Sequence, residues 1–450
     1  MTTRERDWTL PADHLTLEPA ARLVGELWLP GDKSISHRAL MLALLAPGTS
    51  TIRGAGDGAD VRSTASIAAA LGADVARQSS DDASNVEYRV TSPGIDALAA
   101  PERSLDCGNS GTSLRLFAGI IAGQPFEATL DGDASLRGRP MARLAAPLRA
   151  MGATVHGPDG GARPPLRIRG RRPLASVEWT PEVPSAQVKS AILLAGLRAD
   201  GVTRVRETVA TRDHTERMLR ARGVDVCTTS EGPGGSIVEI EGGGTPAPFD
   251  EVVPGDPSAA AFWLVAAAIH PDAEIRLRGV GVNPTRRAAV DLLRRMGARI
   301  EETALESRGE PRADLEACSS DLEAIEVSPA ETAAAIDEIP ILCLAATQAR
   351  GRTTIRGAGE LRHKESDRIA GIVAGLRAFG AKVQNQGDDL VVDGPTALGG
   401  AAVDSLDDHR LAMTFAVAAL IARTQTKMGG AASAAISYPA FFRDLERIRR

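Results

Sequence analysis

The chain has 450 residues, with 52 Lys and Arg against 58 Asp and Glu, so its formal net charge is −6. This mildly acidic balance argues against a general nucleic-acid or anionic-membrane binder, because such proteins carry an excess of basic residues. Hydrophobic residues make up 43% and charged residues 24%, which is typical of a globular protein and excludes a disordered chain.

The four cysteines form no C-x-x-C pair and histidine is scarce, so neither a zinc site nor a disulfide framework is expected. The start of the sequence, MTTRERDWTLP, lacks the apolar segment of a secretory signal. The longest apolar stretch, at 259–269, is too short to cross a bilayer. We therefore expect a soluble protein of the cytoplasm.

Six buried helices are predicted along the chain, each opened by a short polar turn. Ser, Asp, Asn and Thr are frequent N-cap residues, and a helix that is apolar on all sides belongs in a core. In chain order the turns are GDKSIS (31–36), GNSGTS (108–113), PSAQ (184–187), PGDPS (254–258), IDE (336–338) and DDHR (407–410).

A second phrase, in which a helix ends at a glycine and a strand follows, recurs five times. Glycine is expected there because it tolerates the left-handed conformation that ends helices. The sequence therefore predicts a unit of strand, buried helix, strand, amphipathic helix and further strands, present six times, with the sixth copy lacking its last strands. Residues 302–320 are polar and irregular, and we expect a surface excursion there. The five glycines are Gly72, Gly152, Gly223, Gly297 and Gly380.

Several of these helix starts carry residues that suit anions, since a helix N-terminus offers free N–H groups and a positive dipole end. Each motif alone is more often a plain cap or a tight turn than a binding site. Six copies packed around a pseudo-symmetric centre would bring their helix starts together, and Lys and Arg there would hold a ligand with several negative charges. The stretch at 360–368, ELRHKESDR, is either a solvated helix face or a carboxylate flanked by cations, which suits proton transfer.

With these motifs in order, the chain resembles the 5-enolpyruvylshikimate-3-phosphate synthases. The matching segments cover nearly the whole chain: PGDKSISHRAL, GNSGTSLRL, GDASLRGRPM, VPSAQVKSA, TRDHTERM, PGDPSAAAF, IDEIPIL, ELRHKESDR and DDHRLAM. The resemblance implies an α/β fold, a two-domain inside-out α/β barrel of six βαβαββ repeats with the active site in the interdomain cleft. The N-terminal domain would span 29–247, and the C-terminal domain would join 1–28 to 248–450.

The resemblance also implies a reaction of the shikimate pathway, in aromatic amino acid biosynthesis. The enolpyruvyl group of phosphoenolpyruvate would pass to the 5-hydroxyl of shikimate 3-phosphate, with release of phosphate, by addition and elimination through a tetrahedral intermediate. No metal or organic cofactor is implied. The partners would be the two small-molecule substrates, without nucleic acid or membrane, and the protein would be a monomer. Glyphosate would compete for the phosphoenolpyruvate site.

Carried over motif by motif, the resemblance assigns roles to residues from both halves of the chain. Asp337 would accept the hydroxyl proton, and Glu365 would donate a proton to the methylene carbon, with Lys33 as a rival donor. Shikimate 3-phosphate would contact Lys33, Ser34, Arg38, Ser185, Ala186, Gln187, Arg212, Asp337 and Lys364. Phosphoenolpyruvate would contact Lys33, Asn109, Gly111, Arg139, Gln187, Arg368 and Arg410.

Two departures and three rival readings stay open. Ile436 stands where many relatives have a phosphate-binding Lys, and Ala186 replaces a frequent Ser. A sister enolpyruvyl transferase acting on UDP-N-acetylglucosamine would have Lys-Asn in place of Lys33-Ser34. An RNA cyclase built on related repeats would need a catalytic His. A non-catalytic binding relative would not be expected to keep Lys33 together with Asp337, Glu365 and Arg410.

Overall fold

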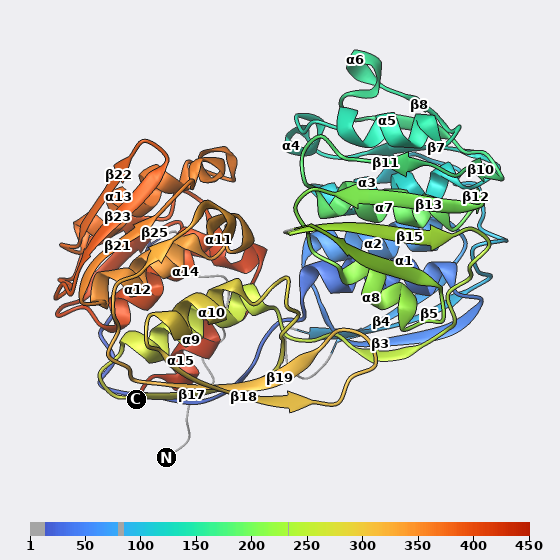
Figure 1. The fold of residues 1–450 in the computed structure, drawn as a ribbon. Helices are drawn as coiled ribbons and strands as arrows, with labels where there is room; N and C mark the ends of the chain where they lie inside the picture. Colours follow the sequence, from blue (N-terminus) through green and yellow to red (C-terminus); the bar gives the residue numbers. More distant parts are fainter. Residues whose placement is uncertain (1–13, 80–84, 233) are drawn as a thin grey trace. The chain divides into compact units, whose positions relative to one another are not determined.

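The computed structural model describes residues 14–79, 85–232 and 234–450 (Figure 1). The chain divides into two compact units. The N-terminal unit comprises Gly31–Val253 together with Ser307–Glu310. The C-terminal unit comprises the described residues up to Pro30, then Pro254–Glu306 and Pro311–Arg450. Residues 1–13 belong to the predicted C-terminal domain and lie outside the described residues.

Each unit is built around three buried helices, and these are the six helices that the sequence predicts. In the N-terminal unit they are α1 (Lys33–Leu45), α3 (Gly111–Ala122) and α7 (Ala186–Gly196), and α3 packs against both others. In the C-terminal unit they are α9 (Pro257–Ile269), α12 (Ile339–Gln348) and α14 (His409–Leu420), which all contact one another. No described helix is long and apolar enough to cross a membrane.

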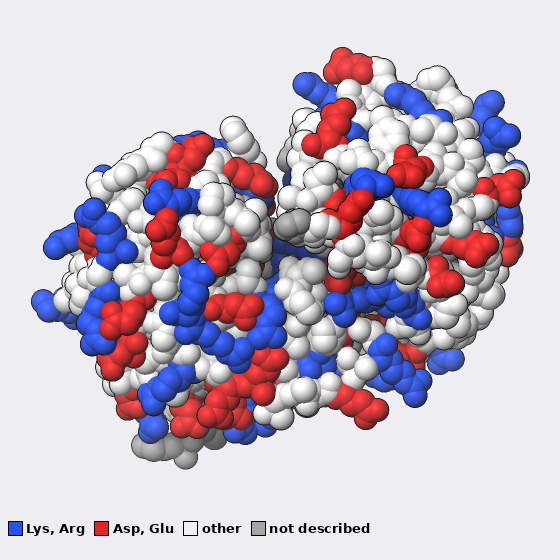
Figure 2. All heavy atoms as spheres, in the orientation of Figure 1, with Lys and Arg blue, Asp and Glu red and all other residues white. Residues whose placement is uncertain are grey.

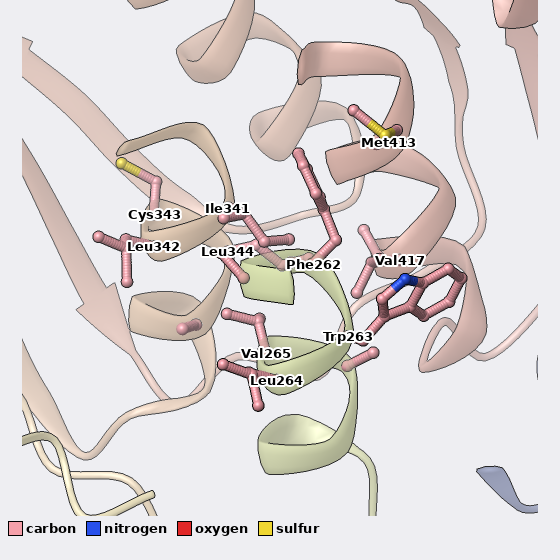
Figure 3. Packing of buried hydrophobic residues seen from close by; sticks show 14 of the residues in the cluster. Phe262, Trp263, Leu264, Val265, Ile341, Leu342, Cys343, Leu344, Met413 and Val417 are labelled. Atoms are coloured by element: carbon pink, nitrogen blue, oxygen red, sulfur yellow. The ribbon is translucent and has the colours of Figure 1, made fainter. Parts of the chain in front are cut away.

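Apolar side chains join the three helices of the C-terminal unit into one core (Figure 3). Phe262 and Trp263 of α9, Ile341 of α12 and Val417 of α14 are all buried there. Trp263 also stacks on Phe441 of α15, with ring centroids 5.0 Å apart. The burial of such large side chains is the main favourable term that holds a unit together, at about 1.5–3 kcal/mol each.

Side-chain caps begin five of the six buried helices, as their polar turns predict. The carboxylate or hydroxyl oxygen of each cap accepts a hydrogen bond from a backbone N–H of the first turn, a group that would otherwise lack a partner. The caps are Asp32, Ser110, Ser185, Asp256 and Asp408. The cap position of α12 is Glu338, whose side chain makes no such bond.

Amphipathic helices alternate with the buried ones along the chain. Those of the N-terminal unit are α2 (Ala59–Ala70), α5 (Ala142–Ala150) and α8 (His214–Arg220), and those of the C-terminal unit are α10 (Ala288–Arg295), α13 (Arg368–Ala378) and α15 (Phe441–Ile448). The five glycines of the repeated phrase follow the first five of these helices with φ between 80° and 103°, as expected. Shorter helical segments are α4 (Ala134–Arg137), α6 (Pro158–Gly161), α11 (Pro329–Ala334), η1 (Gly359–His363) and η2 (Ala431–Ile436).

Three four-stranded sheets cover the helices of the N-terminal unit, and each has one parallel edge strand and three antiparallel strands. In spatial order the first is β16 (Asp250–Val252), β3 (Gly48–Gly56), β5 (Asn85–Ser92) and β4 (Asp74–Ser79). The second is β6 (Leu105–Asp106), β7 (Glu127–Asp131), β9 (Leu166–Arg169) and β8 (Thr154–His156). The third is β11 (Glu178–Trp179), β13 (Val202–Glu207), β15 (Gly235–Glu241) and β14 (Val226–Glu231), and β10 (Leu174–Ala175) pairs with β12 (Ala199–Asp200).

The C-terminal unit repeats this plan in two four-stranded sheets and one three-stranded sheet. The first is β18 (Arg299–Leu305), β19 (Arg312–Cys318), β17 (Ala273–Gly281) and β2 (Leu23–Trp28). The second is β20 (Glu326–Val327), β21 (Gly351–Ile355), β23 (Asp389–Gly394) and β22 (Lys382–Gln386). The third is β1 (His14–Leu17), β25 (Thr426–Gly429) and β24 (Ala402–Asp404). Six repeats, three in each unit, confirm the predicted two-part α/β fold.

Two strands are exchanged between the first and fourth repeats. The strand that precedes α1, β2, pairs in parallel with β17 of the fourth repeat, beginning at Leu23 opposite Ala273. The strand that precedes α9, β16, pairs in parallel with β3 of the first repeat, beginning at Asp250 opposite Thr51. The chain therefore completes one sheet of each unit with a strand that directly precedes the other unit in sequence.

Two details of the sheets bear on the sequence analysis. The sixth repeat lacks its last strands, as predicted, and β1 from the beginning of the chain takes a place beside β25. The predicted irregular excursion at 302–320 is wrong, because β18 and β19 form an antiparallel pair that runs from Arg299 opposite Cys318 to Leu305 opposite Arg312. In β19 every second residue is buried, so the strand pattern was present among the polar residues.

Candidate active site

The start of α1 carries three of the predicted site residues. Lys33 is half-exposed, and its ammonium lies 3.2 Å from a carboxylate oxygen of Asp60. Ser34 follows it in the first turn, which Asp32 caps. Arg38 lies one turn further on and is only 4% exposed. Burial lowers the pKa of Arg38 to about 10, so the guanidinium still carries its charge near neutral pH.

Hydrogen bonds near the GNSGTS turn link three predicted residues to two others, in two separate groups. Arg139 donates to the amide oxygen of Asn109 at 2.7 Å, and the Asn109 amide donates to Asp133 at 2.8 Å. Arg115 donates to the amide oxygen of Gln187 at 2.6 Å. Both guanidinium groups therefore donate to neutral amides here, with the Asp133 carboxylate close enough to interact with the charge of Arg139.

Because Gly111 has no side chain, the guanidinium groups of Arg115 and Arg139 can lie close to its backbone. A Cβ atom on Gly111 would lie 2.7 Å from Nη1 of Arg115 and 3.3 Å from Nη1 of Arg139. Burial lowers the pKa of Arg115 to about 10, and the neighbouring charges of Arg139 and Arg143 act in the same direction. Like charges this close favour a bound anion between them.

Ser185, Ala186 and Gln187 open α7, as predicted. The Ser185 hydroxyl accepts the Val188 N–H at 3.4 Å, and Ala186 is the first residue of the helix. The Gln187 amide donates to the Thr112 hydroxyl at 2.9 Å, which joins the start of α7 to the start of α3. Arg212 is partly buried and lies two residues before α8 begins.

The C-terminal unit gathers the predicted proton-transfer residues around one buried guanidinium. Arg368 is 1% exposed, and it donates to Glu365 at 2.5 Å. Its Nη1 atom lies 3.6 Å from a carboxylate oxygen of Asp337. The ammonium of Lys364 lies 3.9 Å from the same oxygen of Asp337. Asp337 lies just before α12, Lys364 and Glu365 lie between η1 and α13, and Arg368 is the first residue of α13.

Asp408 holds this group to the start of α14. Its buried carboxylate accepts from Nε of Arg368 at 2.8 Å, from the Ser366 hydroxyl at 3.1 Å and from the Arg410 backbone N–H at 2.8 Å. Burial alone would raise the pKa of Asp408, but the hydrogen bond and charge of Arg368 outweigh it and hold the pKa below its usual value. The guanidinium of Arg410 lies 6.0 Å from the ring of Phe262.

Several residues of these groups, among them Arg115, Asp133 and Asp408, are absent from the predicted site. The sequence places Arg115 one turn after Gly111, on the same helix face and among residues that suit an anion, but the resemblance assigns it no substrate contact. Asp133 and Asp408 could not be identified in this way, because their partners are 24 and 40 residues distant. Cys107 is buried, which raises the pKa of its thiol well above the ordinary value, so it is not a reactive thiolate.

The charged surface is otherwise mixed. On the face drawn in Figure 2, Lys and Arg are interspersed with Asp and Glu over both units. Many of these side chains pair locally, for example Arg137 with Asp131 and Arg352 with Asp393. The two guanidinium groups near Gly111, which donate to amides, differ from this pattern and suit a small anionic ligand.

The sequence profile of EPSP synthase (3-phosphoshikimate 1-carboxyvinyltransferase) matches residues 17–445. The chain belongs to the EPSP synthase family. It is 48% identical to the 3-phosphoshikimate 1-carboxyvinyltransferase of Gloeobacter violaceus, across 97% of this chain and 99% of that protein. It is 49% identical to the one of Acidithiobacillus ferrooxidans, across 94% and 95%. Membership in the EPSP synthase family makes the protein a transferase of the shikimate pathway, in aromatic amino acid biosynthesis.

Solved structures agree with this family. The EPSP synthase of Acinetobacter baumannii superposes with a TM-score of 0.88 at 37% identity, across 97% of this chain and 98% of that one. The enolpyruvyl transferase NikO of Streptomyces tendae has a TM-score of 0.76 at 20% identity, which shows a shared fold alone. Matches to EPSP synthases at this coverage do not favour the UDP-N-acetylglucosamine enzyme or a non-catalytic relative.

Proposed function

We propose that this chain transfers the enolpyruvyl group of phosphoenolpyruvate to the 5-hydroxyl of shikimate 3-phosphate and releases phosphate. The observation that carries the proposal is the position of Asp337. Its partly exposed carboxylate lies beside Lys364 and Arg368, within 3.9 Å and 3.6 Å. A carboxylate between two cations can accept a proton from a hydroxyl while the cations hold an anionic substrate.

The N-terminal unit supports the binding of two anions. The cations near Gly111 suit the phosphate of phosphoenolpyruvate, with Asn109, Arg139 and Gln187 as its predicted contacts. The residues assigned to shikimate 3-phosphate are Lys33, Ser34, Arg38, Ser185, Ala186, Gln187 and Arg212. Helix N-termini and guanidinium groups are both favourable partners for phosphate and carboxylate.

The C-terminal unit supports the chemistry. In the addition step Asp337 takes the proton of the 5-hydroxyl as its oxygen bonds to C2 of phosphoenolpyruvate, and Glu365 gives a proton to C3. In the elimination step the Glu365 carboxylate takes a proton back from C3, the double bond forms again, and the C2–O bond to phosphate breaks as the proton held by Asp337 passes to the departing phosphate. Lys33 is the alternative proton donor. Lys364 anchors shikimate 3-phosphate, and Arg368 and Arg410 hold the phosphoenolpyruvate carboxylate.

One ligand of the phosphoenolpyruvate phosphate stays unassigned. Ile436, at the place of the Lys found in many relatives, is 60% exposed in η2. The apolar Ile436 side chain supplies no positive charge that could bind the phosphate. The cytoplasmic location and the monomeric state stay predictions.

The proposed function is tested by phosphate release from the purified protein. With both substrates present, release of phosphate should accompany formation of the enolpyruvyl ether, identified by its mass. Mixtures lacking either substrate should release none. Release with UDP-N-acetylglucosamine in place of shikimate 3-phosphate, or none with the proposed pair, would overturn the proposal.

A further inference from the structure

Three charged side chains are buried together in the N-terminal unit, and none of them has a place in the proposed chemistry. The ammonium of Lys189 on α7 lies 2.7 Å from Glu207 at the end of β13 and 2.7 Å from Glu216 on α8. The three side chains are 1%, 4% and 1% exposed. Burying three charges is costly unless each one is paired, so this cluster calls for a specific explanation.

The two carboxylates of the cluster differ in their other partners. Glu207 also accepts from the backbone and hydroxyl of Thr211 and from the hydroxyl of Ser236. Glu216 has Lys189 as its only side-chain donor in the described part of the chain, and burial raises the pKa of Glu216 above its ordinary value. Burial alone would lower the pKa of Lys189, but Glu216 and Glu207 together raise it. One ammonium faces two carboxylates, so the ionised cluster carries one net negative charge.

Arg38 supplies a positive charge next to this cluster, through the residues that adjoin Lys189 and Glu216 in sequence. Its Nε donates to the Thr215 hydroxyl at 2.8 Å, and its Nη2 donates to the Ser190 hydroxyl at 2.9 Å. Thr215 in turn donates to Ser190 at 2.7 Å. Burial lowers the pKa of Arg38 to about 10. The charges of Glu216, Asp32 and Glu310 oppose this, with Glu216 the largest, and the charge of Arg212 adds to it.

These bonds also fix the direction of the guanidinium. A third donor of Arg38, on Nη1, binds the Ser34 carbonyl at 3.0 Å. An arginine has five N–H donors, so one remains on each Nη atom. Such a pair suits the two oxygens of a carboxylate or phosphate.

We infer that Thr215, Ser190 and the Lys189–Glu207–Glu216 cluster are positioning residues for Arg38, which orient its guanidinium and balance its charge, and that they thereby set the affinity for shikimate 3-phosphate. The inference rests on the role proposed above for Arg38. It concerns groups that do not themselves touch the substrate. The ion pair of Lys189 with Glu216 also joins α7 to α8. The cluster therefore fixes the start of α7, which Ser185 caps, relative to the start of α8, which Arg212 precedes.

The first test compares Thr215→Val with Thr215→Ser. Valine keeps the volume and removes the hydroxyl that Arg38 uses, whereas serine keeps the hydroxyl. The valine variant should bind shikimate 3-phosphate about tenfold more weakly, the smaller end of the loss that one charge-assisted hydrogen bond causes. Its kcat at saturation should change less than its KM, and the serine variant should bind like the parent. Titration calorimetry and steady-state kinetics measure both.

The second test removes the excess charge with Glu216→Gln, and Glu251→Gln is its matched control. Glu251 is a mostly buried carboxylate of the same unit, paired with Arg222, and among the described residues no hydrogen bond joins it to Arg38 or its partners. The Glu216 variant should weaken shikimate 3-phosphate binding several-fold and lower the pH at which that binding is lost in base. The control variant should do neither.

The outcomes separate this inference from the proposed function. A parent protein without activity, or an Arg38→Lys variant that binds shikimate 3-phosphate like the parent, would remove the proposed role of Arg38. A weakened Arg38→Lys variant together with unchanged binding in Thr215→Val would overturn the positioning role alone. So would equal losses in the valine and serine variants. Thermal unfolding checks that each variant folds, and Ser190→Ala replaces Thr215→Val if that variant does not.

Discussion

The helix starts of the two units hold the same kinds of charged residue but give them different partners. In the N-terminal unit Arg115 and Arg139 donate to the amides of Gln187 and Asn109. In the C-terminal unit Arg368 donates to two carboxylates and approaches a third, that of Asp337. The first arrangement directs guanidinium donors to neutral amides, whereas the second directs one guanidinium to carboxylates of the protein as well as to its proposed ligand.

The same repeat can therefore serve substrate binding in the N-terminal unit and proton transfer in the C-terminal unit, because the helix starts of both units share a backbone geometry. The N–H groups and the cap are common to both units, and the side chains of the first turn decide what the start can do. The comparison predicts that changes in the C-terminal group affect mainly turnover. Changes in the N-terminal group should affect mainly binding.

The largest effect is expected for Asp337→Asn. The substitution keeps the volume and removes the proposed base, so kcat should fall by about 10²–10⁴-fold, the usual contribution of a general base. Asp393→Asn is a suitable control, since Asp393 is a more exposed carboxylate of the same unit paired with Arg352. Near-normal turnover of the Asp337 variant in the phosphate-release assay would remove that residue from the mechanism.

Glu365→Gln should lower kcat by about 10²-fold, at the lower end of the range for an acid or base. The amide cannot donate a proton to the methylene carbon as a carboxylic acid can. Steady-state kinetics with both substrates separates the possible results. A higher KM with unchanged kcat would leave Glu365 as electrostatic support for Arg368 and would assign the proton donor to Lys33.

The N-terminal unit should lose stability in mild acid through His37. Burial lowers the pKa of His37 to about 3, and the charges of Lys33 and Arg38 act in the same direction. In the unfolded chain the His37 imidazole therefore takes up a proton near pH 6.5, whereas in the folded chain it stays neutral down to about pH 3. Keeping His37 neutral therefore costs the folded state nothing above pH 6.5. Between pH 6.5 and about 3 the free energy of unfolding falls as the pH falls.

From pH 7 to pH 5 the His37 contribution should fall by roughly 2 kcal/mol, at 1.4 kcal/mol per pH unit below the ordinary value. Denaturant unfolding of the parent and of His37→Asn at both pH values measures it. The amide can still meet the Thr64 hydroxyl, which lies 2.6 Å from Nδ1 of His37. An equal loss in parent and variant would show that another group is responsible.

The smallest effect is expected for Gly111→Ala. The added methyl group would press on Arg115 and Arg139, so Arg115 must shift away from Gln187. We expect KM for phosphoenolpyruvate to rise about tenfold, equivalent to about 1.4 kcal/mol, and inhibition by glyphosate to weaken. Gly399→Ala is the control, because a Cβ there meets nothing nearer than 3.9 Å. Stronger glyphosate inhibition of the Gly111 variant would contradict the proposed pocket.

Local signals in the sequence were sufficient for the six buried helices and for the glycines that end the amphipathic ones. Caps such as Ser110 and Asp408 act within one helical turn, and Gly72 adopts its positive φ whatever packs around it. The polar turns also placed Lys33, Gly111 and Gln187 of the candidate site in the first turns of buried helices. The hairpin of β18 and β19 was missed because its polar face hid an alternation of buried residues.

Only the tertiary structure decided which distant segments meet. The pairing of β2 with β17 and of β16 with β3 joins strands about 200 residues or more apart, and no local propensity encodes such a choice. The same holds for Arg368 with Asp408, and for Arg38 with Thr215, 177 residues away. A buried polar or charged group is costly in free energy unless it is paired, and this follows from its chemistry. Which partner is close enough to pair with it is determined by how the chain packs.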